Sequence, residues 1–283
     1  MGSLVWDPLV RSEDRVGQVN VPFGDGLVGG EPETDQQFTR RIFRDEVPDN
    51  EDNPDRLNGL VGIGVYALES LPKPSAFACL REIVSRLHEL AVEVKGGVTW
   101  ETPPNLVIEM QRESAPEGYY NLGLAHGVPG IWRILAEAGL EGIESAASFE
   151  LLEKSISWSL DQKLFEKGGF PAWIPIGRER LDDFRFAWCY GDAGVAISLF
   201  STARLLGNKG WEETALSIAR NIAHSPPDVA KVNEAGLCHG SSGLGHILNR
   251  FYQATGEESF QKASRYWFGR TLQYRKVGEG IGG

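Results

Sequence analysis

The 283-residue chain has few cysteines, no long apolar run and fewer basic than acidic residues. Its three cysteines are an odd number, which argues against a disulfide framework and favours a reducing, cytoplasmic setting. No apolar run reaches the length of about 20 residues that a membrane-spanning helix needs, so we expect no membrane span. The stretch Met1–Gly17 also lacks the basic and apolar regions of a secretory signal.

The charge balance narrows the class of partner. Lys and Arg number 28 against 39 Asp and Glu, and the net charge is −11. Nucleic-acid binding depends on cationic side chains that neutralise phosphates, so we expect no nucleic-acid partner. Hydrophobic residues make up 41% of the chain, which is enough for a substantial core.

The pattern of the sequence changes near residue 55. Residues 1–54 are acidic, contain proline and are expected to be weakly structured, with one short helix candidate at Gln37–Asp45. Residues 55–283 are expected to form one all-α domain, because apolar residues recur there at helical spacing. The helical segments are Gly62–Ser70, Ala76–Val94, Ile131–Ala138, Ser148–Asp161, Val195–Leu206, Trp211–Ile222, Leu244–Ala254 and Phe260–Leu272. The best strand candidate is "NLVIEM", at residues 105–110.

A glycine-rich turn repeats along the helical part. The strings GLVG, GVPG, GDAG, GSSG and GIGG begin at residues 59, 127, 191, 240 and 280. Each of the first four precedes an apolar segment, and a more amphipathic segment usually follows it. This repeat predicts helical hairpins arranged as a toroid or solenoid, with the glycine turns gathered at one end.

Two of the three cysteines occupy equivalent places beside these turns. Cys189 lies two residues before the GDAG turn and Cys238 two residues before the GSSG turn, with His239 next to it. Two thiolates and one imidazole suit zinc, and three protein ligands are typical of a catalytic zinc site that keeps one position open. Cys79 lies among apolar residues of a helical segment, where packing is the better interpretation. A small buried side chain is the alternative role for Cys189.

Four strings resemble the signatures of the lanthionine synthetase C-like (LanC-like) cyclases. They are "DRLNGLVGIG", "GLAHGVPG", "WCYG" and "LCHG", and they cover about residues 55–283 in the family's order. The resemblance implies an α/α toroid, or barrel, of helical hairpins. We count four hairpins here against the family's seven, so the toroid is expected to be incomplete and truncated at the C-terminus.

The resemblance also implies roles for individual residues. Cys189, Cys238 and His239 would bind zinc, and His126 would be the acid/base residue. Asp55, Arg185 and Tyr190 match positions at which the family has active-site residues. For Asp55 and Arg185, a solvated charge is the alternative interpretation.

The implied reaction closes lanthionine or methyllanthionine rings. A substrate cysteine thiolate adds to dehydroalanine or dehydrobutyrine, and His126 protonates the resulting enolate. Arg185 or Tyr190 would stabilise the enolate oxygen, and Asp55 would orient His126 or Arg185. The expected partners are a dehydrated, cysteine-containing precursor peptide and a separate dehydratase.

Two other functions fit parts of the sequence. A non-catalytic member of the family would keep the zinc and bind glutathione or cysteine-containing peptides. A glycoside hydrolase built on an α/α toroid would use two carboxylates, and Asp182, Asp183 and Asp192 crowd one turn. The hydrolase interpretation leaves the two cysteines and His239 unexplained.

Overall fold

A computed structural model describes residues 56–164, 169–179 and 184–275. The expectations for residues 1–54, for Asp55 and for the glycine turn at residue 280 lie outside the described residues. No helix of the described part is both long enough and apolar enough to cross a membrane.

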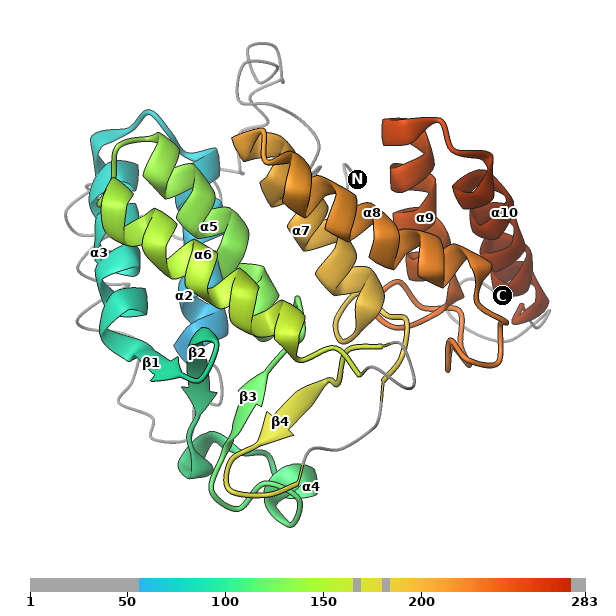
Figure 1. Cartoon of the computed structure of the whole chain (residues 1–283), viewed down its shortest axis with the longest axis horizontal. Coiled ribbons are helices and arrows are strands. Elements are labelled where there is room, and N and C mark those ends of the chain that lie inside the picture. The colour runs from blue at the N-terminus through green and yellow to red at the C-terminus, as the bar shows by residue number, and fades with distance from the viewer. Residues whose placement is uncertain (1–55, 165–168, 180–183, 276–283) are drawn as a thin grey trace, which may run out of the picture.

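Helical hairpins form most of the described structure, as the sequence predicts (Figure 1). The four hairpins of this part are α2 (Arg56–Glu69) with α3 (Pro74–Leu90), α5 (Val128–Leu140) with α6 (Ser145–Asp161), α7 (Asp192–Leu206) with α8 (Lys209–His224), and α9 (Ser241–Thr255) with α10 (Glu258–Gln273). Within each hairpin the two helices pack together, and α2 contacts α5, α5 contacts α7, and α7 contacts α9. The hairpins therefore follow one another in chain order.

The two helices of a hairpin differ in burial, and the sequence pattern explains the difference. Every residue of α7 from Asp192 to Ala203 is buried, so this helix is covered on all sides. Helix α8 buries only a stripe, which consists of Ala215, Leu216, Ile218, Ala219 and Ile222. An apolar helix thus lies inside the array, and an amphipathic helix covers it.

The connection between α7 and α8 shows how a short turn joins them. Gly207 ends α7 with φ 68°, a left-handed conformation that glycine adopts without a Cβ clash. The side chain of Asn208 then accepts a hydrogen bond from the backbone N–H of Trp211, at 3.1 Å, and caps α8.

A small antiparallel sheet accompanies the helices. Its strands β1 (Ala91–Val94), β2 (Gly97–Thr102), β3 (Tyr119–Asn121) and β4 (Trp173–Pro175) are paired in that order. The expected strand at residues 105–110 is wrong: the segment holds the 3₁₀ turn η3 (Pro104–Leu106) and enters α4 (Glu109–Arg112). The helix expected over Ala76–Val94 ends at Leu90, and β1 begins at the next residue, Ala91. The overlooked signal is "VEVKGGVTW", because β-branched residues on both sides of Gly-Gly are typical of a hairpin.

One continuous hydrophobic core connects the hairpins and the sheet. Trp100, Trp132, Phe200 and Phe251 are among its fully buried side chains. The indole Nε1 of Trp100 donates to the carbonyl oxygen of Leu87 at 2.8 Å, which joins β2 to α3. Strand β3 ends at Asn121, and the segment from Leu122 to His126 connects it to the second glycine turn at Gly127.

Candidate functional site

The two cysteine turns have the same backbone arrangement. The N–H of Gly194 donates to the carbonyl oxygen of Ala187, and the N–H of Gly243 donates to that of Gly236, at 3.0 and 3.4 Å. Both bonds span seven residues, so each turn folds back over the start of the helix that follows it.

Close packing explains why each turn needs its second glycine. A Cβ on Gly194 would lie 2.2 Å from the carbonyl oxygen of Trp188, and a Cβ on Gly243 would lie 1.9 Å from that of Leu237. In the turn before α5, a Cβ on Gly130 would lie 2.7 Å from the carbonyl oxygen of Leu124. The repeated string therefore marks positions where the backbone leaves no room for a side chain.

Backbone hydrogen bonds connect three turns to one another. The N–H groups of Trp188 and Cys189 both donate to the carbonyl oxygen of Cys238, at 3.2 and 3.3 Å. The carbonyl oxygen of Cys189 accepts from the N–H of Ala125 at 3.4 Å. The turns that begin α5, α7 and α9 are thus held side by side.

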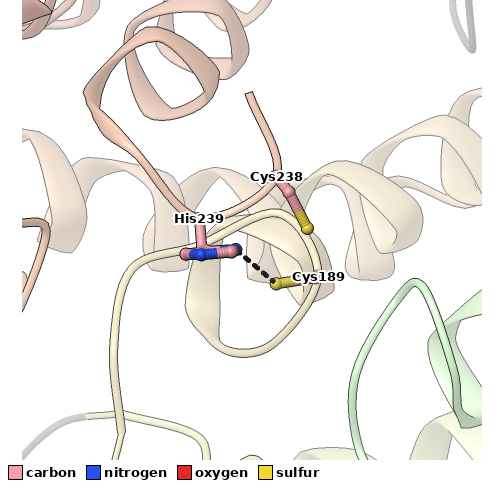
Figure 2. Close-up of side chains that lie close together, drawn as sticks. All are labelled: Cys189, Cys238 and His239. Carbon is pink, nitrogen blue, oxygen red and sulfur yellow. Dashed lines mark hydrogen bonds between the residues drawn. The ribbon is translucent and has the colours of Figure 1, made fainter. Parts of the chain in front are cut away.

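This arrangement brings Cys189, Cys238 and His239 together (Figure 2). One ligand atom from each residue lies within 4.8 Å of the other two. Cys189 is buried and Cys238 is exposed, while Nδ1 of His239 lies 4.0 Å from the Sγ of Cys189. Ligand atoms around a tetrahedral zinc are separated by about 3.5–3.8 Å, given Zn–S near 2.3 Å and Zn–N near 2.0 Å. The spacing and the donor chemistry of these residues therefore fit a zinc ion with small adjustments.

Glu234 holds the far side of the His239 ring. The Nε2 atom of His239 lies 3.2 Å from Oε1 of Glu234. In the tautomer that donates this hydrogen bond, Nε2 carries the hydrogen and Nδ1 presents its lone pair toward Cys189. A carboxylate behind a ligating imidazole is the usual support for a metal-binding histidine.

The surroundings of Cys189 disfavour the thiolate form of its side chain. Burial, together with the neighbouring Cys238, raises the pKa of Cys189 to about 11. A divalent cation between the two sulfurs would reverse this effect, because it favours the thiolate of both. Cys79, by contrast, lies in the core on α3, and burial alone raises its pKa to about 11.

His126 and Tyr190 form a second group next to the cysteines. Their rings stack with centroids 5.7 Å apart and an interplanar angle of 29°. The amide Nδ2 of Asn121 donates to the hydroxyl oxygen of Tyr190 at 3.3 Å, and Oδ1 of Asn121 accepts from the N–H of Gly123 at 2.9 Å. Asn121 thus fixes both the tyrosine hydroxyl and the turn that carries His126.

Arg185 lies with Tyr190 in the lining of a cleft of about 350 Å³. Its guanidinium opposes the rise in the pKa of Cys189, which places its charge within electrostatic reach of that sulfur. Asp55 lies outside the described residues. The structure therefore groups six of the seven proposed site residues around three adjacent turns.

Of the three carboxylates of the hydrolase alternative, Asp192 lies in the described part of the chain. Asp192 is fully buried at the start of α7 and accepts a hydrogen bond from the N–H of Phe170 at 3.1 Å. Asp182 and Asp183 lie outside the described residues. Asp192 therefore has a structural position rather than that of a carboxylate acting on a sugar.

Sequence reasoning missed Asn121 and Glu234. Glu234 gave a weak signal, since it is a carboxylate five residues before a proposed histidine ligand. Asn121 gave none, because its contact with Tyr190 joins residues 69 positions apart.

Comparisons with known proteins agree on one family. The family model described as "Lanthionine synthetase C-like protein" matches residues 33–276. The nisin biosynthesis protein NisC of Lactococcus lactis subsp. lactis is 28% identical over 218 residues, which are 73% of this chain and 51% of that protein. The glutathione S-transferase LANCL1 of Danio rerio is 28% identical over 134 residues, which are 47% of this chain and 31% of that protein.

A solved structure of nisin cyclase has the same fold. It superimposes with a TM-score of 0.68 at 24% sequence identity, covering 84% of this chain and 61% of the cyclase chain. This likeness confirms the expected α/α toroid architecture. The chain spans about half the length of NisC and about a third of that of LANCL1.

Proposed function

Because the chain belongs to the lanthionine synthetase C-like family, we propose that it forms thioether rings in a peptide. The observation that carries the proposal is the convergence of Cys189, Cys238 and His239 beside the stacked pair of His126 and Tyr190. The substrate would be a dehydrated peptide with a free cysteine, and a separate dehydratase would act before this protein. The proposal places the activity in residues 55–283, in the cytoplasm, with residues 1–54 as an acidic segment.

Cys189, Cys238 and His239 would hold a zinc ion, and Glu234 would orient His239. When bound, zinc supplies a Lewis acid that lowers the pKa of the substrate thiol and leaves it as a thiolate near neutral pH. The thiolate sulfur bonds to the β-carbon of dehydroalanine or dehydrobutyrine, and the π electrons of the double bond move into an enolate.

His126 is the proposed proton donor to the α-carbon of this enolate. The imidazole is exposed at the rim of the turn, where substrate can reach it, and its stacking on Tyr190 restricts its orientation. An imidazole has one nitrogen that accepts a proton and one that donates, so His126 can accept the proton released by the substrate thiol and deliver it to carbon. The proton balance of the ring closure is then complete without another reagent.

Tyr190 and Arg185 are the proposed stabilisers of the enolate oxygen. The hydroxyl oxygen of Tyr190 accepts from Asn121, which strengthens the hydroxyl as a donor. Arg185 adds a positive charge in the same cleft. Asp55 is proposed to orient His126 or Arg185.

Exposed apolar side chains beside the cysteines support a peptide substrate. Trp188 is 40% exposed and Leu237 is 70% exposed, and each directly precedes a proposed zinc ligand. Apolar groups exposed next to a polar site are typical of surfaces that bind another chain.

Binding of thiols without ring closure is the alternative function. The name of LANCL1, a glutathione S-transferase, favours it. In this alternative the zinc site would bind glutathione or a cysteine-containing peptide and produce no ring.

The test compares the full chain with Cys238→Ala and, as a matched control, Cys79→Ala. Zinc content is measured by elemental analysis. Because ring closure does not change the mass, it is followed by loss of the free thiol that N-ethylmaleimide would label on a dehydrated nisin-type peptide. We expect Cys238→Ala to lose most of its zinc and all cyclisation, whereas Cys79→Ala keeps both.

Two other outcomes would contradict the proposal. Unchanged zinc content in Cys238→Ala removes the metal-site assignment. Zinc-dependent binding of glutathione by the wild type, without ring formation in any peptide, favours the alternative.

A further inference from the structure

Two of the three cysteine sulfurs lie close enough to react with each other. All three cysteines are free thiols in the structure. The Sγ atoms of Cys189 and Cys238 lie within 4.8 Å of each other, between two of the glycine turns (Figure 2). The sulfurs of a disulfide are about 2.05 Å apart, so rotation about the two Cα–Cβ bonds can close this gap.

The main chain places the two residues at the spacing that a disulfide needs. The N–H of Cys189 donates to the carbonyl oxygen of Cys238 at 3.3 Å. Two residues joined by a backbone hydrogen bond have Cα atoms about 5–6 Å apart, as in antiparallel strands. Cysteines joined by a disulfide usually have Cα atoms about 4.4–6.8 Å apart. A bond between the sulfurs therefore requires little movement of either turn.

The two thiols differ in their access to solvent. Cys238 is exposed, and so are Gly236 and Leu237 directly before it. Cys189 is only 3% exposed. In a redox-active pair, an accessible sulfur meets the reagent and a second sulfur resolves the mixed disulfide that forms. The difference in exposure assigns the first role to Cys238 and the second to Cys189.

His239 is placed to accept a proton during such a reaction. Its Nδ1 atom lies 4.0 Å from the Sγ of Cys189, and its Nε2 atom lies 3.2 Å from Oε1 of Glu234. In the tautomer that donates to Glu234, Nδ1 has a lone pair for the thiol hydrogen. A thiol, an imidazole and a third group that orients the imidazole form the arrangement that activates a cysteine as a nucleophile.

We infer that Cys189 and Cys238 form a redox-active pair that exchanges with a small disulfide of the glutathione type. The sulfur of Cys238 attacks one sulfur of oxidised glutathione, whose S–S bond breaks and releases one reduced glutathione. The sulfur of Cys189 then attacks the sulfur of Cys238, and the second glutathione leaves. Two electrons pass from the pair to the glutathione disulfide, and the two thiol protons end on the two glutathione molecules that leave.

This pair goes beyond the proposed function and competes with it for the same sulfurs. A disulfide uses both sulfurs in a covalent bond and leaves no thiolate to hold a metal ion. If the two sulfurs also hold the zinc of the proposed function, the oxidised chain and the zinc-bound chain exclude each other. Oxidation would then control whether the metal site exists.

Mixtures of reduced and oxidised glutathione test the inference on the full chain, with a chelator present to remove zinc. The reaction is stopped with acid, and the remaining thiols are counted by labelling the unfolded chain with N-ethylmaleimide and measuring its intact mass. The variants are Cys189→Ser and Cys238→Ser. Cys79→Ala is the matched control, because Cys79 is 2% exposed in the core on α3 and lies outside the cluster.

We expect the wild type to lose two of its three thiols together, without attached glutathione, and peptide mapping to join Cys189 to Cys238. Cys189→Ser should stop at a mixed disulfide, with one glutathione on Cys238. Cys238→Ser should keep both of its thiols, and Cys79→Ala should form the same disulfide as the wild type. Added zinc should protect both thiols in the wild type, and the oxidised chain should bind zinc only after reduction.

Retention of all three thiols by the wild type at every glutathione ratio would overturn the inference. A stable mixed disulfide on Cys238 of the wild type would also overturn it, as would a disulfide that includes Cys79 or a second chain. The thiol count needs neither substrate nor zinc, so it is independent of ring closure. If the oxidised and reduced chains bind zinc equally well, the metal-site assignment fails and the redox pair stands. Ring closure by a chain whose pair never oxidises rejects the redox pair alone.

Discussion

Substitution of Glu234 by Gln tests whether a carboxylate supports the metal ligand His239. Oε1 of Glu234 lies 3.2 Å from Nε2 of His239, while Nδ1 of the same ring faces Cys189. Glutamine keeps the size of the side chain and an oxygen that accepts a hydrogen bond, but it removes the negative charge. The variant therefore reports the effect of that charge on zinc affinity.

The size of the effect follows from the exposure of the pair. Loss of a carboxylate behind a metal-binding histidine typically weakens metal binding 10- to 100-fold. The side chains of His239 and Glu234 are 44% and 50% exposed, so water screens their interaction and the lower end of this range applies. We expect about a tenfold loss of zinc affinity, which corresponds to about 1.4 kcal/mol.

Competition with a chromophoric chelator measures zinc affinity directly and needs no substrate. Glu93→Gln is the matched control. Glu93 lies on β1 and makes an exposed ion pair with Lys154 of α6, and its substitution changes the net charge equally. Cobalt substitution adds a second reading, since thiolate-to-cobalt absorption reports whether both sulfurs still bind. If Glu234→Gln and Glu93→Gln bind zinc equally well, the proposed support of His239 by Glu234 is refuted.

Three further predictions concern stability. Gly243→Ala should lower both the melting temperature and the zinc content, because the added Cβ would clash with the carbonyl oxygen of Leu237. Its control is Gly269→Ala on α10, where an added Cβ would have no atom within 4 Å. This control should stabilise the protein by about 0.5–1 kcal/mol. Glu137→Gln should reduce the free energy of unfolding in urea by about 3 kcal/mol, since it removes the negative charge that Glu137 places beside the buried Arg133; a loss below 1 kcal/mol would contradict this. Burial raises the pKa of Asp192 to about 7 from 3.8, so the unfolded chain binds fewer protons than the folded one between these values. Stability should therefore fall as pH rises through this window, by up to about 1.4 kcal/mol per pH unit, and Asp192→Asn should flatten the slope; equal slopes in both proteins would refute the assignment.

The helices and the cysteine turns could be predicted from sequence because their signals are local. Apolar residues at helical spacing mark α5 to α10, and glycines mark the places where the backbone approaches itself. The equivalence of Cys189 and Cys238 could be read from their common distance to a glycine turn. Each of these features depends on residues fewer than ten positions apart.

The sheet and the supporting residues depend on contacts that are not local. Strands β3 and β4 have three residues each and pair Tyr119 with Pro175, so neither carries a recognisable period of its own. Asn121 reaches Tyr190 only after two hairpins have packed together. Sequence patterns do not contain this information, because tertiary packing creates the contacts.

The position of the proposed site depends on the main chain more than on its reactive side chains. Cys189 donates its N–H to Cys238 and accepts from Ala125 through its carbonyl oxygen, and both bonds are independent of the thiol. Removal of a sulfur should therefore eliminate metal binding while the three turns stay together. A substitution at Gly194 or Gly243 should have the opposite effect. It keeps every proposed ligand but displaces the backbone that positions the ligands. The ligand chemistry and the alignment of the turns are thus separable by substitution, and zinc affinity measured beside unfolding free energy distinguishes them.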